Sequence, residues 1–187
     1  MPENCPKSVT IKRNARSPSS RTDGHVQTEW AVTIGRNTHP VLVYRQVLDL
    51  SNAEARAESF EAMFKRHGWP PAWRYHLYDF DHFHSTAHEA LGIFRGQAKA
   101  RLGGPNGREL MLYAGDVLVL PAGVGHACVE ADEDFCMVGA YPPGQEADIE
   151  RGDSVQLAAA QSRVAAVALP EDSPVGGSIT ALWEQVS

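Results

Sequence analysis

The chain has 187 residues, of which 43% are hydrophobic, enough for one domain with a buried core but not for two full domains. Its formal net charge is −6 and no basic patch stands out, which argues against nucleic acids and anionic membranes as partners. No apolar stretch reaches the roughly 18 residues of a membrane-spanning helix. The three cysteines, Cys5, Cys128 and Cys136, do not make a disulfide framework and indicate a reducing, cytoplasmic environment.

The N-terminal segment is polar and irregular, and it lacks acidic side chains from Cys5 to Thr22. A transit peptide has a similar composition, but Pro6, Pro18 and the missing apolar face favour a flexible tail over residues 1–24.

Residues 25–71 are predicted to form an N-terminal extension with one strand and one helix. The apolar run Val41–Tyr44, continuing to Leu48, is typical of a strand. Ser51–Glu54 matches a capping box, in which the serine accepts an amide hydrogen bond and the glutamate reaches back. The helix expected over Ala53–His67 has an apolar stripe and a terminating glycine, namely Ala57, Phe60, Phe64 and Gly68.

Residues 72–145 change to short strands separated by turns, and we expect them to form the core of a barrel. The predicted strands are Trp73–His84, Glu89–Arg95, Gln97–Leu102, Glu109–Tyr113, Val117–Leu120, His126–Glu130 and Phe135–Tyr141. Gly103–Gly107 is a turn, and the acidic residues 131–134 are expected to close a hairpin. Many short strands with frequent turns indicate an all-β antiparallel barrel or sandwich.

Residues 146–187 are expected to form a C-terminal extension that packs on the barrel. The Ala- and Gln-rich stretch 154–164 predicts a short helix, and Arg163–Leu169 has the composition of a returning strand.

Three histidines and one glutamate form a candidate metal site. His82 and His84 are two residues apart, so on a strand their imidazoles project from the same face. Glu89 follows at a distance that permits a short loop, and His126 would come from a distant strand. Imidazole and carboxylate suit Fe, Mn, Co, Ni, Cu or Zn, and nothing in the sequence selects among these metals. A lone His-x-His pair, by contrast, is usually packing or a solvent-facing pair.

The residues expected around this site are mainly apolar. Ile93 shares strand parity with Glu89, and Met137 alternates on the last predicted strand, so both are candidate substrate-binding residues. His76 and Tyr78 share parity with His82 and are further candidates. For His76 the favoured alternative is a surface histidine at the fraying end of the strand. An apolar pocket with one polar focus favours a small organic ligand.

Two neighbouring groups are assigned lesser roles. His88 is adjacent to Glu89 and should point to the opposite face of the strand, which indicates a supporting hydrogen bond. His88 as a substitute ligand is the minor alternative. Cys128 shares parity with His126, but a buried thiol that packs as a small apolar group is the default, because no base is apparent that would activate it.

These residues resemble the two motifs of the cupin superfamily. The first, Gly-x5-His-x-His-x3-4-Glu-x6-Gly, is matched by His82, His84, Glu89 and Gly96, with His76 in place of its opening glycine. The second, Gly-x5-Pro-x-Gly-x2-His-x3-Asn, is matched by the residues Gly115, Pro121, Gly123 and His126, with Glu130 in place of its closing asparagine. The departures remove no ligand.

Four further segments resemble the uncharacterised YjlB-like cupins, over roughly residues 40–185. They are Gly68–Arg74, His84–Glu89, Gly139–Pro142 and the closing Asp-Ser-Pro-Val-x-Gly stretch. The resemblance implies a double-stranded β-helix, a jelly-roll-like barrel, with one N-terminal helix and a short C-terminal helical segment.

The resemblance also implies a divalent metal bound by His82, His84, Glu89 and His126. It implies a homodimer paired through sheet edges, for which Val41–Tyr44 is a candidate edge strand. Dioxygenases and sugar or keto-acid isomerases are neighbours in the superfamily, so a metal-dependent enzyme acting on a small molecule is expected. The alternatives are a non-catalytic binding or sensor protein, and a structural barrel with an empty site.

Overall fold

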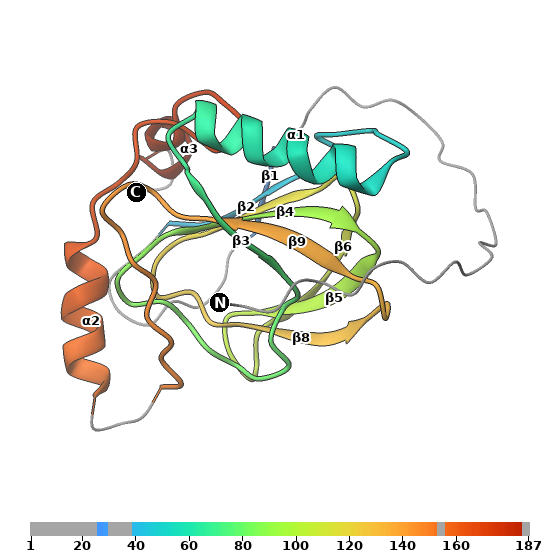
Figure 1. The fold of residues 1–187 in the computed structure, drawn as a ribbon. Coiled ribbons are helices and arrows are strands. Elements are labelled where there is room, and N and C mark those ends of the chain that lie inside the picture. The colour runs from blue at the N-terminus through green and yellow to red at the C-terminus, as the bar shows by residue number, and fades with distance from the viewer. Residues whose placement is uncertain (1–25, 30–38, 153–155, 185–187) are drawn as a thin grey trace.

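The computed structural model describes residues 26–29, 39–152 and 156–184. The larger of two antiparallel sheets has the strand order β1 (Val26–Glu29), β2 (Val41–Tyr44), β7 (Val117–Leu120), β4 (Glu89–Arg95), β9 (Cys136–Ala140) and β3 (Pro71–Tyr75). The smaller sheet has the order β6 (Arg108–Tyr113), β5 (Gln97–Leu102) and β8 (His126–Ala131). Three helices, α1 (Ala53–Arg66), α2 (Leu157–Ala166) and α3 (Ile179–Glu184), accompany the sheets (Figure 1).

From β4 to β9 the chain crosses repeatedly between the two sheets in the manner of a jelly roll, which confirms the predicted all-β fold. Strand β4 pairs with β7 and β9, which come from distant parts of the chain. Its direct continuation β5 belongs to the other sheet and pairs with β6 and β8. Gly96 makes this crossing possible: its φ of 70° favours glycine, and a Cβ there would lie 2.9 Å from the backbone of Phe135.

The larger sheet is covered on both faces, which explains why its central strands are continuously apolar. Helix α1 lies along the face turned away from the smaller sheet (Figure 1), where its stripe of Ala57, Phe60 and Phe64 is fully buried. The other face packs against the smaller sheet. In β2, Leu42 therefore belongs to the helix-side cluster, whereas Val41 and Val43 belong to the cluster between the sheets.

Helix α1 has nearly the predicted bounds but a different N-cap. The side chain of Asn52, not of Ser51, accepts the hydrogen bond from the amide of Ala55 at 3.0 Å. Glu54 does not close a capping box but pairs with Arg74 of β3 at 2.5 Å. The ion pair with Arg74 therefore engages the Glu54 carboxylate that the local pattern predicts to cap helix α1.

Two predicted strand assignments are wrong. Trp73–His84 is not one strand, because β3 ends at Tyr75 and residues 79 and 80 form a bend before a second extended piece. That piece contacts the smaller sheet through the pair His82 and His126. Residues 131–134 do not close a hairpin, because β8 and β9 belong to different sheets.

Two further corrections concern the edges of the fold. Val41–Tyr44 is not an exposed edge, because β2 is fully buried and lies between β1 and β7. The expected strand Arg163–Leu169 is wrong, because helix α2 continues to Ala166. Helix α3 was not anticipated. The expected tail 1–24 lies outside the described residues.

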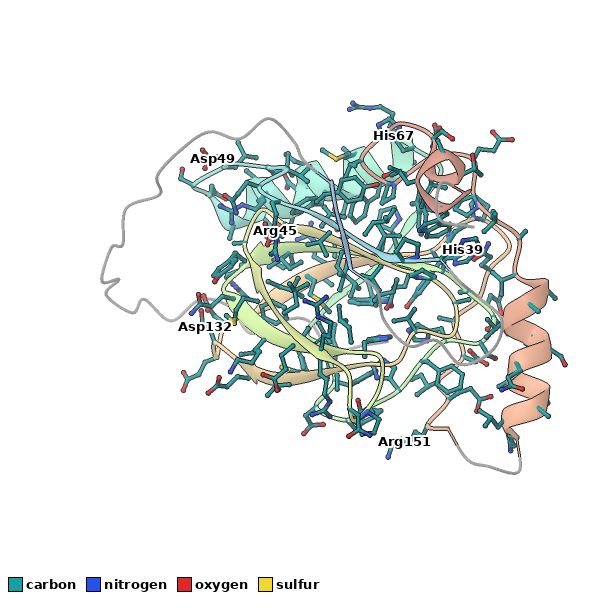
Figure 2. All side chains as sticks on the ribbon, turned by 180° about the vertical axis from the view of Figure 1, so that it is seen from behind. His39, Arg45, Asp49, His67, Asp132 and Arg151 are labelled. Atoms are coloured by element: carbon teal, nitrogen blue, oxygen red, sulfur yellow. The ribbon has the colours of Figure 1, made fainter. Side chains whose placement is uncertain are left out.

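The side chain of Arg45 links the two sheets. Arg45, labelled in Figure 2 at the end of β2, pairs with the buried Asp116 at 2.6 Å and donates to the carbonyl of Met111. Cys128 is a free, partly exposed thiol. None of the helices in the described part of the chain is long and apolar enough to cross a membrane.

Candidate metal centre

Three buried histidines converge between the two sheets. His82 exchanges backbone hydrogen bonds with His126, the first residue of β8, at 3.2 and 2.8 Å. Their ring centroids are 4.1 Å apart, and the ring of His84 lies 5.4 Å from each. One ligand nitrogen from each histidine lies within 4.8 Å of the others. The group could therefore hold one metal ion.

The backbone orients each imidazole in the same way. Nδ1 of His82 lies 3.1 Å from the carbonyl of Phe80, and Nδ1 of His126 lies 3.1 Å from the carbonyl of Val124. Nδ1 of His84 contacts the carbonyl of Asp148. A carbonyl only accepts, so each Nδ1 carries a proton, and Nε2 is the nitrogen that carries the lone pair when the ring is neutral. This is the arrangement that metal-binding histidines require.

Glu89, the first residue of β4, completes the cluster. Its Oε2 lies 3.4 Å from Nε2 of His84 and 3.4 Å from Nε2 of His126. Its Oε1 accepts a hydrogen bond of 3.0 Å from the hydroxyl of Tyr141. That hydroxyl in turn accepts a bond of 2.8 Å from the indole nitrogen of Trp73. Because the indole can only donate, it directs the Tyr141 proton to Glu89.

The electrostatics of the cluster keep Glu89 charged. Burial alone would raise the pKa of Glu89, but His84, His126 and Tyr141 outweigh burial and lower it to about 2. Burial works against protonated His84 as well, yet the Glu89 carboxylate raises the His84 pKa to about 9. For His126, burial dominates and lowers the pKa to about 3. Near neutral pH the cluster thus offers an ionised Glu89 and a neutral His126, with His84 protonated as the counter-charge of Glu89.

The segment that follows β9 helps to fix the position of His84. Besides its carbonyl contact to His84, Asp148 accepts a hydrogen bond of 2.6 Å from the amide of Ser85. Arg163 of α2 donates to the Ser85 hydroxyl at 2.6 Å and also pairs with Glu150. The C-terminal extension therefore contributes to the site, which periodicity along the sequence could not indicate.

The cluster opens into one cavity of about 240 Å³. Its lining residues are Trp73, Tyr75, His76, Leu77, Tyr78, His82, His84, Glu89, Leu91, His126, Met137, Tyr141, Ala147 and Ile149. Of the candidate substrate-binding residues, His76, Tyr78 and Met137 line this cavity, and His76 is also exposed. Ile93 does not line the cavity, because its side chain is fully buried in the core between the two sheets.

Several residues that line the cavity carry no clear signal in the sequence. Tyr141 alternates with Met137 along the last predicted strand, but Tyr75 follows no pattern that separates it from an ordinary strand residue. Ala147 and Ile149 lie in an irregular segment without periodicity.

The two neighbours with lesser predicted roles lie apart from the cluster. His88 is buried, and its Nδ1 accepts a hydrogen bond of 3.0 Å from the amide of Ala122. Its ring centroid lies 5.0 Å from that of Trp183. Burial lowers the pKa of His88 to about 4. Cys128 is partly exposed and lines a separate surface hollow.

Comparison with known proteins places the chain in a family. No family model matches it. A solved structure of a DUF861 family protein from Thermotoga maritima aligns with a TM-score of 0.31 and 18% identity, covering 53% of this chain and 96% of that one. The uncharacterised protein YjlB of Bacillus subtilis is 32% identical over 145 residues, which cover 78% of this chain and 84% of YjlB. Together with the jelly-roll fold and the cupin-type histidine motifs, this identity establishes that the chain belongs to the YjlB-like cupins.

Proposed function

We propose that the protein binds one divalent transition metal through His82, His84, Glu89 and His126. The main support is that three oriented imidazoles lie within reach of one ion, that the ionised Glu89 lies 3.4 Å from two of them, and that all four side chains line one cavity. A divalent cation would neutralise the buried Glu89 carboxylate and bind the Nε2 atoms of the three histidines at the same time. Nitrogen and oxygen donors suit Fe, Mn, Co, Ni, Cu or Zn.

We propose further that the protein is a metal-dependent enzyme that acts on a small organic molecule. A bound metal would supply Lewis acidity or electron transfer to a substrate in the cavity. The chain's own residues hold the imidazole tautomers, keep Glu89 ionised and surround the substrate with apolar walls. A cytoplasmic location and a homodimer remain part of this proposal.

Metal analysis tests the site directly. We expect the purified wild-type protein to carry close to one equivalent of metal, and the His82→Ala, Glu89→Ala double variant to carry almost none, because half of the ligands are removed. His76→Ala is the matched control, since this exposed histidine lines the cavity but lies outside the cluster. Equal metal content in the double variant and the wild type would contradict the site.

Oxygen consumption separates an enzyme from a sensor. The metal-free protein is loaded with Fe(II) or Mn(II) and incubated in air with diketones, catechols and keto acids. An oxygenase would consume oxygen with at least one of these compounds, and an isomerase would convert a keto acid without oxygen. Tight ligand binding without any turnover would instead favour the binding or sensor protein.

Tyr141→Phe is expected to lower metal affinity by roughly tenfold to a hundredfold, the usual effect of losing a hydrogen bond that orients a ligand. The substitution removes only the hydroxyl that fixes Oε1 of Glu89. Competition with a chromophoric chelator measures the affinity. Tyr113→Phe is the control, because Tyr113 is exposed on β6. An unchanged affinity in Tyr141→Phe would show that Glu89 needs no such orientation.

A further inference from the structure

The cavity above the histidine cluster has an unusual composition. Apart from the three cluster histidines and Glu89, its walls are aromatic or aliphatic, with one histidine at the mouth. The main contributors are Trp73, Tyr75, Tyr78, Leu91, Met137 and Ile149. Within the described residues, no lysine, arginine, aspartate, asparagine, glutamine, serine or threonine lines it.

Such walls do not suit a ligand with many hydroxyl groups. Each hydroxyl that enters without a new partner loses its hydrogen bonds to water, at a cost of about 1–3 kcal/mol. Outside the cluster, the polar groups of the lining are the hydroxyls of Tyr75, Tyr78 and Tyr141, the indole nitrogen of Trp73 and the ring of His76. The Tyr141 hydroxyl already donates to Glu89 and accepts from Trp73. A sugar with five hydroxyl groups would therefore leave several of them unpaired.

The same walls offer no cation for a phosphate. Arg74, Arg101 and Arg163 each form ion pairs with carboxylates. Arg151 is exposed at the periphery of the molecule, as Figure 2 shows, and its guanidinium lies 3.9 Å above the ring of Phe80. None of these four arginines lines the cavity.

The size of the cavity and its aromatic walls favour one flat ring. An apolar cavity of about 150 Å³ accommodates benzene, so about 240 Å³ accommodates a substituted ring. The rings of Tyr75 and Tyr78 meet edge to face at 6.1 Å, and Tyr78 also meets His82 edge to face at 5.2 Å. Aromatic walls of this kind hold planar rings more strongly than saturated ones of equal size.

We infer that the cavity takes a small planar aromatic or conjugated compound with one oxygen-bearing group directed at the histidine cluster, and that it rejects sugars and phosphorylated compounds. The inference rests on the proposed function only in the direction of the oxygen-bearing group. Among the activities considered, it favours chemistry on aromatic or conjugated oxygen compounds over sugar isomerisation.

Three anionic probes of different shape test the inference. Benzoate and cyclohexanecarboxylate share a carboxylate and a six-membered ring, and differ in planarity. Glucose 6-phosphate represents sugars and phosphates. Ligand-observed NMR on the zinc-loaded protein should give benzoate an affinity roughly three- to tenfold above that of cyclohexanecarboxylate. We expect no binding of glucose 6-phosphate.

A pair of variants locates the preference. Tyr78→Leu should reduce the ratio of the two affinities towards one, while Tyr113→Leu, at an exposed position on β6, should leave it unchanged. Binding of glucose 6-phosphate as tight as that of benzoate would overturn the inference, as would equal affinities for benzoate and cyclohexanecarboxylate in the wild type.

The metal content of the same samples separates this inference from the proposed function. If the protein holds no metal and yet the metal-free form prefers benzoate, the proposed metal site fails and the inference about the walls stands. If the metal is bound and no preference appears, the walls have been misassigned and the metal site stands.

Discussion

Gly139→Ala is expected to lower both the free energy of unfolding and the affinity for metal. A Cβ at Gly139 would lie 2.1 Å from a ring carbon of Trp73, which faces it across the pair of β3 and β9. The rigid indole would have to shift, at a cost of about 1–3 kcal/mol. Its shift would also break the chain of hydrogen bonds from Trp73 through Tyr141 to Glu89.

Urea unfolding and chelator competition measure the two effects of Gly139→Ala. Gly92→Ala is the matched control, because a Cβ there would lie 2.8 Å from the Phe60 ring on the helix side of the same sheet. It should destabilise the protein by overpacking and leave metal affinity unchanged. If Gly92→Ala weakened metal binding as much as Gly139→Ala, the effect would be general and not carried by the indole of Trp73.

The metal-free protein is expected to lose stability in acid, below about pH 6.5. Burial holds the pKa of His126 at about 3 and that of His88 at about 4, against 6.5 in the unfolded chain. Below pH 6.5 the unfolded chain therefore binds protons that the folded chain does not bind, and stability falls with pH. His88 alone would account for roughly 3 kcal/mol by about pH 4.

His84 and Glu89 set the limits of the pH range in which the metal-free protein is most stable. The pKa of His84 is raised to about 9 by Glu89 against the effect of burial, so its stabilisation is complete below pH 6.5 and is lost as pH rises through 9. The lowered pKa of Glu89 gives stabilisation that is complete above pH 4.5 and is lost as pH falls from there through about 2. We therefore expect maximal stability of the metal-free protein near pH 6.5.

Urea unfolding of chelator-treated protein between pH 4 and pH 8 measures this dependence. In His88→Asn the amide oxygen can still accept the hydrogen bond of Ala122, but the side chain no longer titrates. The variant should therefore lose less stability between pH 6.5 and pH 4 than the wild type. An identical slope in both proteins would show that His88 is not buried in its neutral form.

Much of the fold was predictable because local patterns and tertiary contacts agree. The stripe of Ala57, Phe60 and Phe64 predicted helix α1, and the strand predicted over Gln97–Leu102 is β5. The predictions were wrong where the structure of a segment depends on a partner that is distant in the sequence. Residues 131–134 look like a hairpin loop locally, but β8 and β9 find their partners in different sheets.

The candidate site divides in the same way. The spacing of His82, His84, Glu89 and His126 along the chain was enough to identify the side chains that could bind a metal. The groups that surround these side chains depend on how distant segments pack together. Trp73 and Asp148 reach the cluster from a separate strand and from an irregular segment, and hydrogen bonds between such distant groups leave no periodic trace in a sequence.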